Sequence, residues 1–261
     1  MTQQKFKYLY GPVHSWRLGM SLGIDPIATE EKICNFNCVY CQLGDTAVQT
    51  RERKIFVATQ ALVDEVNAFI PPVPLDYLTF SGRGEPTLAK NLGEMLRALK
   101  AVRRERIAVI TNSGLMGDPQ VCEDLMAADC VLAKLDAPNQ HVFDTIDRPS
   151  GENFFSIVDG LKEFARVFKG KFALQLMFIP ENKDCGPAMA EIAREIAPQE
   201  IELNTPLRPC AVQPLGVDEM QKIQAAFQGI PGVTMVYDRK RQSVDPMDEE
   251  ATIRRHGDYK H

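Results

Sequence analysis

The feature that most constrains the fold is a regular alternation of strand-like and helix-like segments. Short apolar runs of the kind that a parallel sheet buries are separated by segments in which apolar residues recur at helical spacing. The expected strands are 75–82, 106–114, 129–138, 171–180, 199–207 and 233–238, and the expected helices are 58–70, 89–102, 118–128, 153–168, 186–197 and 218–228. This alternation predicts a parallel α/β sheet with right-handed crossovers, either doubly wound or barrel-like.

Polar side chains recur where four of these strands end. They are Ser81 and Glu85, Thr111 and Asn112, Lys134 and Asp136, and Asn204. The carboxyl ends of parallel strands form the usual ligand face of an α/β sheet or barrel. The recurrence therefore predicts a shared binding site at this face, although polar residues also gather at strand ends because the chain leaves the core there.

Composition and charge limit the number of domains, the kinds of partner and the cellular location that are expected. With 261 residues, 44% of them hydrophobic, the chain can bury a core, and we expect one domain over 1–237. The net charge of −5 provides no global basic field for nucleic acid. No apolar run is long enough to span a membrane, and the first residues do not resemble a secretory signal, so a cytoplasmic protein is expected. The charged tail, 238–261, is predicted to be solvated or mobile.

Three of the seven cysteines are crowded into CNFNCVYCQLG, residues 34 to 44. A reducing cytosol disfavours structural disulfides, so metal binding or redox chemistry is the better interpretation of this cluster. The other four cysteines are isolated in the sequence. Cys122 and Cys130 are expected to be small buried residues, and Cys185 and Cys210 lie beside glycine and proline in predicted loops.

The spacing of Cys34, Cys38 and Cys41 requires a loop, because a regular helix cannot present all three sulfurs to one point. Structural zinc usually takes four protein ligands, and neither Cys122 nor His14 has the partner spacing to supply the fourth. An iron–sulfur cube bound by three thiolates leaves one iron open to a substrate or cofactor. Such a cluster is the favoured interpretation, with zinc as the alternative.

The segment CNFNCVYC resembles the cluster-binding signature of the radical S-adenosylmethionine (SAM) superfamily. The resemblance implies that Cys34, Cys38 and Cys41 hold a [4Fe-4S] cluster whose open iron binds the amino and carboxylate groups of the cofactor's methionine. It also implies an open, partial (β/α)6 barrel of the TIM type, with the cluster at its top and a first strand around SLGID. The domain over 1–237 would then be a radical SAM core.

Further segments resemble the same superfamily. FSGRGEP, residues 80 to 86, is similar to the segment that holds the cofactor's ammonium group, which implies that Gly82 and Gly84 let the backbone approach while Glu85 supplies a negative charge. TNSG, residues 111 to 114, is similar to a turn near the cofactor, and Lys134 or Asp136 would reach its ribose or carboxylate. The candidates for further cofactor or substrate contacts are Asn112, Asp136 and Asn204.

Three further segments resemble the sequences of enzymes related to the tRNA wyosine-base synthase. They are GPVHSWRLGMSLGID, KLDAP and LNTPLRP. Those enzymes carry a second cluster held by cysteines upstream of the first, and no cysteine precedes Cys34 here. Together with the acidic net charge, this difference makes RNA the less favoured substrate. The resemblance therefore implies a relative that acts on another, unassigned substrate, either a small molecule or a protein.

The implied reaction is reductive cleavage of SAM to a 5′-deoxyadenosyl radical, which removes a hydrogen atom from the substrate. It requires an external one-electron donor of the flavodoxin or ferredoxin type. Cys210 is the spare thiol that we would test as a substrate-specific proton donor or acceptor. The alternatives are a glycyl-radical activating enzyme that acts on a partner protein, and a non-catalytic metal or iron–sulfur module that would leave SAM intact.

Overall fold

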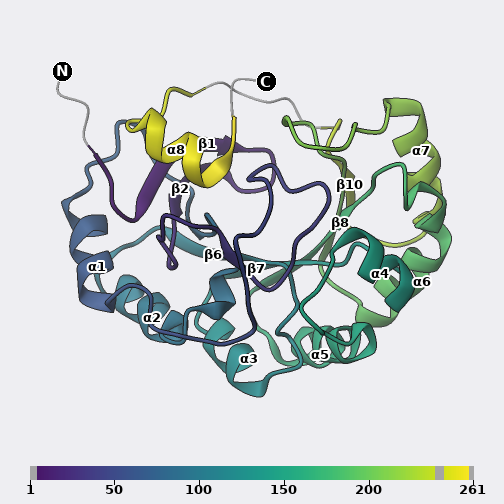
Figure 1. Ribbon diagram of the computed structural model, residues 1–261, viewed down its shortest axis with the longest axis horizontal. Helices are drawn as coiled ribbons and strands as arrows, with labels where there is room; N and C mark the ends of the chain where they lie inside the picture. Colours follow the sequence, from purple (N-terminus) through teal and green to yellow (C-terminus); the bar gives the residue numbers. More distant parts are fainter. Residues whose placement is uncertain (1–4, 239–243, 259–261) are drawn as a thin grey trace.

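The computed structural model describes residues 5–238 and 244–258, and a single curved sheet dominates it (Figure 1). Its strands follow the order β1-β2-β5-β6-β7-β8-β9-β10, in which only the β1–β2 pair is antiparallel. A separate two-stranded pair joins β3 (Ile33–Cys34) and β4 (Val48–Gln49). The strands of the large sheet are β1 (Leu9–Ser15), β2 (Gly19–Ile24), β5 (Tyr77–Phe80), β6 (Arg106–Thr111), β7 (Cys130–Lys134), β8 (Lys171–Met177), β9 (Glu200–Asn204) and β10 (Val233–Met235).

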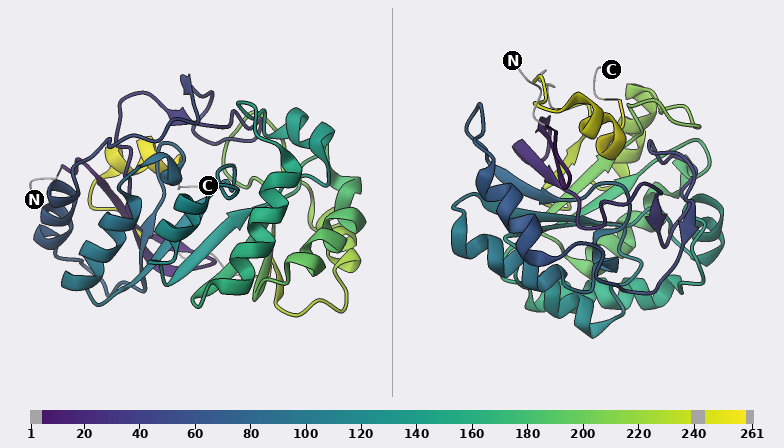
Figure 2. Two further views of the ribbon diagram at one scale, coloured as in Figure 1. Left: turned by 90° about the horizontal axis from the view of Figure 1, so that it is seen from below. Right: turned by 60° about the vertical axis from the view of Figure 1, so that its left-hand side comes forward.

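Helices separate the parallel strands and follow the outer side of the curved sheet (Figures 1 and 2). They are α1 (Thr59–Ala68), α2 (Leu92–Val102), α3 (Pro119–Leu125), α4 (Gln140–Ile146), α5 (Phe154–Val167), α6 (Gly186–Ile196) and α7 (Val217–Ala226). Side chains satisfy the exposed backbone amides where several of them begin: Asp118, Asn139 and Asn153 accept hydrogen bonds from Gln120, Val142 and Ser156. This arrangement confirms the predicted α/β fold and its open, partial barrel.

Apolar side chains fill the space between the sheet and these helices. In α5, Phe154, Leu161 and Phe164 lie on one face and are buried, as their helical spacing predicts. The strands that they cover are buried on both sides, because Val109 of β6 and Leu174 of β8 are fully inaccessible to solvent. The predicted first strand around SLGID is confirmed as β2.

The ends of the described chain differ from the expectation. Strand β1 pairs with β2 ahead of the predicted first strand, and residues 249–256 form a helix, α8 (Glu249–His256), that lies beside β1 (Figure 1). The prediction of a solvated or mobile tail is therefore wrong for residues 244–258. Asp248 caps the helix, and Arg255 is buried because its guanidinium pairs with the carboxylate of Asp25. Residues 239–243 and 259–261 lie outside the described residues.

The boundary proposed at residue 237 stays a prediction. Among the residues that the structure describes, no helix is long and apolar enough to cross a membrane. The cytoplasmic location also stays a prediction.

Candidate functional site

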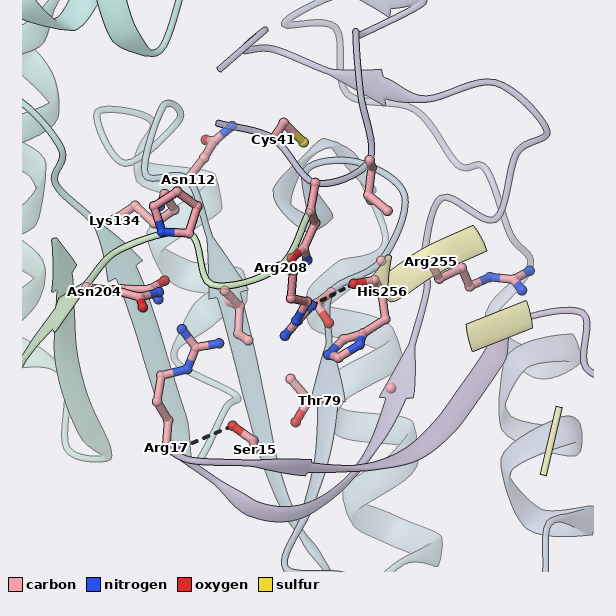
Figure 3. Close-up of a pocket in the computed structure, with 18 of the residues that line it drawn as sticks. Ser15, Arg17, Cys41, Thr79, Asn112, Lys134, Asn204, Arg208, Arg255 and His256 are labelled. Atoms are coloured by element: carbon pink, nitrogen blue, oxygen red, sulfur yellow. Dashed lines mark hydrogen bonds between the residues drawn. The ribbon is translucent and has the colours of Figure 1, made fainter. Parts of the chain in front are cut away.

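A cavity of about 560 Å³ opens at the carboxyl ends of the parallel strands and extends along the inner side of the sheet (Figure 3). Most of the residues that the sequence predicts for a site line this one cavity. They are Cys34, Cys38, Cys41, Gly82, Gly84, Glu85, Asn112, Lys134 and Asn204. The fold thus brings together segments that are far apart in the sequence, as expected for strand ends that share one edge of a sheet.

The cysteine loop is held by backbone hydrogen bonds to other parts of the chain. It starts at the end of β3, where the Thr50 amide donates to the Cys34 carbonyl oxygen at 3.0 Å. The Val39 amide donates to the Ile146 carbonyl oxygen at 2.9 Å, which ties the loop to the end of α4. Within the loop, the Cys41 amide donates to the Cys38 carbonyl oxygen at 3.1 Å. These contacts fix the loop that carries the three thiols.

The thiols lie in surroundings that disfavour an isolated thiolate. Burial raises the pKa of Cys34 to about 12, and the nearby negative charge of Glu85 adds to the effect. Burial also raises the pKa of Cys38 well above its usual value. A bound metal centre supplies the positive charge that a deprotonated thiol needs in such a site. Lys32 supplies part of that charge, since its ammonium lies 3.1 Å from the Cys41 sulfur.

The spacing of the thiols distinguishes the two metal centres considered from the sequence. Among the described residues, no three His, Cys, Asp or Glu side chains lie close enough together to hold a single metal ion. A tetrahedral zinc ion would need its sulfur ligands within about 4 Å of one another, given Zn–S bonds of about 2.3 Å. A cluster with one thiolate on each of three irons needs them further apart. Three thiols that line one cavity, in a chain whose described residues form no site for a single metal ion, are compatible with a cluster.

Glu85 lies at the start of the short helix η1 (Pro86–Leu88) and is 2% exposed. One carboxylate oxygen accepts hydrogen bonds from the Thr87 amide, the Thr87 hydroxyl and the Thr111 hydroxyl at 3.0, 2.7 and 2.7 Å. The other accepts the Asn112 amide at 2.7 Å. Burial raises the pKa of Glu85 in spite of these four donors. A cationic group in the cavity would therefore stabilise the ionised form of this carboxylate.

The two glycines before Glu85 are required by close packing within the protein. Gly82 has a φ of +131°, and a Cβ at this position would lie 2.6 Å from the carboxyl carbon of Asp25. A Cβ on Gly84 would lie 1.9 Å from the Ile33 carbonyl oxygen, next to Cys34. The position of the missing side chain is thus filled by other atoms of the protein at both glycines. Both residues also line the cavity.

Asn112 and Asn204 both line the cavity, but in different surroundings. The Asn112 side chain donates to Asn35 Oδ1 at 2.7 Å and lies 3.6 Å from the Cys34 sulfur, so it joins the cysteine loop to the Glu85 segment. Asn204 ends β9, and its side-chain oxygen accepts the Thr205 amide at 3.0 Å. Figure 3 shows Asn204 pointing into the open part of the cavity.

Asp136 does not line the cavity, contrary to the expectation of a direct ligand contact. Its carboxylate accepts the Met177 amide at 2.7 Å, pairs with the Lys134 ammonium at 3.0 Å and accepts a short hydrogen bond from the Tyr40 hydroxyl. Tyr40 also lies 2.8 Å from a carboxylate oxygen of Asp147, whose pKa is raised to about 7 by burial and by the negative charge of Asp136. Asp136 is therefore placed to hold Tyr40 and Lys134, which do line the cavity.

The isolated cysteines lie away from the cavity lining. The Cys210 thiol donates to the Val212 carbonyl oxygen at 3.3 Å and packs in a small apolar cluster with Tyr40, which does line the cavity, so the role of Cys210 as a proton donor or acceptor stays a prediction. Cys130 is fully buried in β7, as predicted, and Cys122 is half-buried on α3. Cys185 is half-buried where α6 begins.

Several residues of the cavity lining were not predicted from the sequence. His14 and Arg17 come from the β1–β2 hairpin, Arg208 from the segment after β9, and Arg255 and His256 from α8. Arg208 donates to the His256 carbonyl oxygen at 2.6 Å (Figure 3). His14, Arg17 and Arg208 lie in the segments GPVHSWRLGMSLGID and LNTPLRP, which were noted for their resemblance but not as parts of a site, because the five residues meet only through the pairing of β1 with β2 and the packing of α8 beside β1.

Comparison with known proteins agrees with this geometry. Residues 32–193 match the model of the Radical SAM superfamily. The chain is 41% identical over 210 residues to a UPF0026 protein of Synechocystis sp., covering 80% of this chain and 78% of that protein. It superposes on the structure of TYW1 with a lysine-pyruvate adduct bound with a TM-score of 0.63 at 18% identity, covering 80% of this chain and 73% of TYW1. The TM-score for Streptococcus suis SuiB bound to S-adenosylmethionine is 0.60 at 10% identity, covering 78% of this chain and 48% of SuiB. These two structures share the fold.

Proposed function

The chain belongs to the radical SAM superfamily, and from this premise we propose that it is an enzyme whose cavity generates a 5′-deoxyadenosyl radical and directs it to a bound substrate. Enzymes of this superfamily bind a [4Fe-4S] cluster and SAM and need an electron donor and a substrate. The observation that carries the proposal is the shared cavity: three cysteines and the buried Glu85 line the same wall.

We assign the cluster to Cys34, Cys38 and Cys41, and the cofactor's ammonium group to Glu85. When bound, the cluster supplies the electron that cleaves the sulfonium of SAM. The cysteine loop holds the thiols in place, and the donors from Thr87, Thr111 and Asn112 orient the Glu85 carboxylate. A buried carboxylate with a raised pKa favours a cationic ligand, because that ligand offsets the cost of keeping it ionised.

The cavity walls have a second task, which is to keep water and bystander groups away from a reactive carbon radical. Substrate has to lie beside the cofactor before cleavage, since a primary radical attacks any C–H bond in contact with it. We propose a flavodoxin- or ferredoxin-type protein as the electron donor. The Asn112 and Asn204 side chains are the polar groups that we propose for further contacts to cofactor or substrate.

The test is anaerobic reconstitution with iron and sulfide, reduction, and addition of SAM, with 5′-deoxyadenosine and methionine measured by mass spectrometry. We expect both products from the intact protein. We expect neither from Cys38→Ala, which removes one cluster ligand, whereas Cys122→Ala removes a thiol outside the cavity and should behave as the parent does. A fully loaded, reduced protein that binds SAM but yields neither product, with or without cell extract as a substrate source, would contradict the proposal.

A further inference from the structure

The end of the cavity around Arg17, together with the adjoining segment after β9 and helix α8, is rich in cationic and hydrogen-bond-donating groups. Figure 3 shows Arg17 and Arg208 reaching into the cavity from opposite sides, with His256 beside Arg208 and with Thr79 and Asn204 nearby. Glu85 is the only carboxylate among the described residues that line the cavity, and it lies at the other end, beside Cys34. Positive groups therefore outnumber negative ones in the lining itself, while Glu202, Asp136 and Asp25 lie behind it and pair with Arg17, Lys134 and Arg255.

The β1–β2 hairpin presents two buried side-chain nitrogen atoms that have no hydrogen-bond partner among the described residues, and the Arg17 Nε is a donor. Arg17 Nε and His14 Nδ1 are inaccessible to solvent and have no hydrogen-bond partner among the described residues. The Glu202 carboxylate lies 3.8 Å from Arg17 Nε, which is too long for a hydrogen bond. A buried polar group without a partner is costly, and the part of the Arg17 side chain that remains accessible, 13% of it, is where an anionic ligand in the cavity would pair with the guanidinium.

These groups come from parts of the chain that the superfamily model does not match. That match spans 32–193 and contains the cysteines and Glu85. His14 and Arg17 precede it, and Arg208 and His256 follow it. These segments therefore lie outside the part shared across the superfamily model, and because GPVHSWRLGMSLGID and LNTPLRP resemble one group of its enzymes, a substrate site here would be particular to such a group rather than common to the superfamily.

We propose that this end of the cavity binds an anionic group of a small substrate, either a carboxylate or a phosphate, with Arg17 as its main partner. The inference rests on the proposed function, because it names the substrate class of the same site. Guanidinium groups bind both anions through paired N–H donors. Trp16, also in the lining, lies beside the Arg17 guanidinium, whose central carbon is 5.5 Å from the centre of the indole ring.

The enclosure of Arg17 favours a small molecule over a polymer. Its side chain is 13% exposed, so a single charged group can reach it but a continuous phosphate backbone cannot lie across it. An anion held there and SAM held near Glu85 would place the remainder of the substrate between them. The anionic group is thus an anchor, and the C–H bond that reacts lies on the part of the substrate that faces the cofactor.

The inference is tested by anaerobic calorimetry on the reconstituted protein with SAM bound, with inorganic phosphate and acetate as separate probes. We expect at least one probe to bind, and Arg17→Gln to weaken that binding about tenfold or more, the effect of losing a charge-assisted pair. Arg166→Gln, a matched change on the exposed outer face of α5, should leave binding unchanged. Binding of phosphate alone indicates a phosphate ester as substrate, and binding of acetate alone a carboxylate.

Arg17→Gln could weaken binding merely by disturbing the β1–β2 hairpin, so Arg208→Gln serves as a second variant in another segment. SAM binding by each variant reports whether the cavity is intact. Failure of both probes to bind the parent protein, or equal binding by the parent, Arg17→Gln and Arg208→Gln, would overturn the inference. Cofactor cleavage is measured separately. If SAM is cleaved but neither anion binds, this inference is contradicted and the proposed function is not. If an anion binds but SAM is not cleaved, the proposed function is contradicted and the anion site is not.

Discussion

The two ends of the cavity are built in different ways. The cluster end consists of short loops that follow β3, β5 and β6, all within the part that matches the superfamily model. The opposite end is built from the β1–β2 hairpin, the segment after β9 and helix α8, all outside that part. One end has thiols and a buried carboxylate, and the other has guanidinium and imidazole groups. The family therefore indicates how the radical is made, while the flanking segments are the part of the chain that we propose selects the substrate.

The largest effect is expected where the flanking segments join the cluster end. Arg255 of α8 pairs with Asp25 at 3.1 Å, their side chains are 3% and 1% exposed, and Asp25 also accepts the Arg83 amide at 3.3 Å. Arg255→Met leaves a buried carboxylate without its cation. We expect the free energy of unfolding to fall by about 3–5 kcal/mol in urea denaturation, which is the usual result of breaking a buried pair.

Arg254→Met is the matched control, because Arg254 is the exposed neighbour on the same helix. It should change the free energy of unfolding by less than about 0.5 kcal/mol. If the two substitutions have equal effects, α8 is a peripheral addition and the two ends of the cavity are not coupled through Asp25.

A smaller effect, confined to the cluster end, is expected for Glu85→Gln. The substitution keeps the shape but removes the charge assigned to the cofactor's ammonium group. We expect SAM affinity, measured by anaerobic equilibrium dialysis, to fall about 10- to 100-fold, since a hydrogen bond to a charged group contributes about 1.5–3 kcal/mol. Iron content should be unchanged, and Glu123→Gln on the exposed face of α3 should bind SAM as the parent does.

The pH dependence sharpens this prediction. Burial raises the pKa of Glu85, and the ionised carboxylate is the form that attracts an ammonium group. SAM affinity is therefore expected to be full above the raised pKa of Glu85 and to fall as the pH drops through it. Glu85→Gln should lack this dependence, and a parent protein whose affinity is flat at acidic pH would show that Glu85 does not contact the ammonium group.

The smallest effect is expected at the molecular surface, where another ion pair joins the matched and flanking parts. Lys183 Nζ lies 3.4 Å from Glu219 Oε1, and the two side chains are 44% and 43% exposed. Lys183→Met should change the free energy of unfolding by less than about 1 kcal/mol, because solvent screens such pairs. A loss as large as that of Arg255→Met would mean that α7 contributes more to the fold than its exposure indicates.

Local patterns were sufficient to predict the repeating part of the fold. The strand predicted over 106–114 is β6, because a strand that is covered on both faces has a short run of apolar residues that can be recognised in the sequence. The helix predicted over 153–168 is α5, which begins after its capping residue Asn153. Strand β1 was missed because LYGPVHS contains glycine and proline. Helix α8 was missed because it is highly charged, and the partner that buries Arg255 is 230 residues away in the sequence.

The candidate site divides in the same way. Cys34, Cys38 and Cys41 are recognisable because one loop carries all three, and Glu85 because glycines surround it. Arg17 lies in the recognisable segment GPVHSWRLGMSLGID, but nothing local assigns it to a site, since its place in the cavity depends on a hairpin and on segments from the end of the chain. Asp136 was expected to contact a ligand because it follows a strand, but strand ends also carry residues such as this one that hold their neighbours.

Trp16 is the chain's single tryptophan, and it lies in the cavity wall beside Arg17. Its indole is a built-in fluorescent reporter whose emission responds to the local environment. Because no other indole contributes a background signal, filling the cavity from the anion side should be visible in the untagged, unmodified protein. Candidate substrates can therefore be screened by tryptophan emission before any product is known.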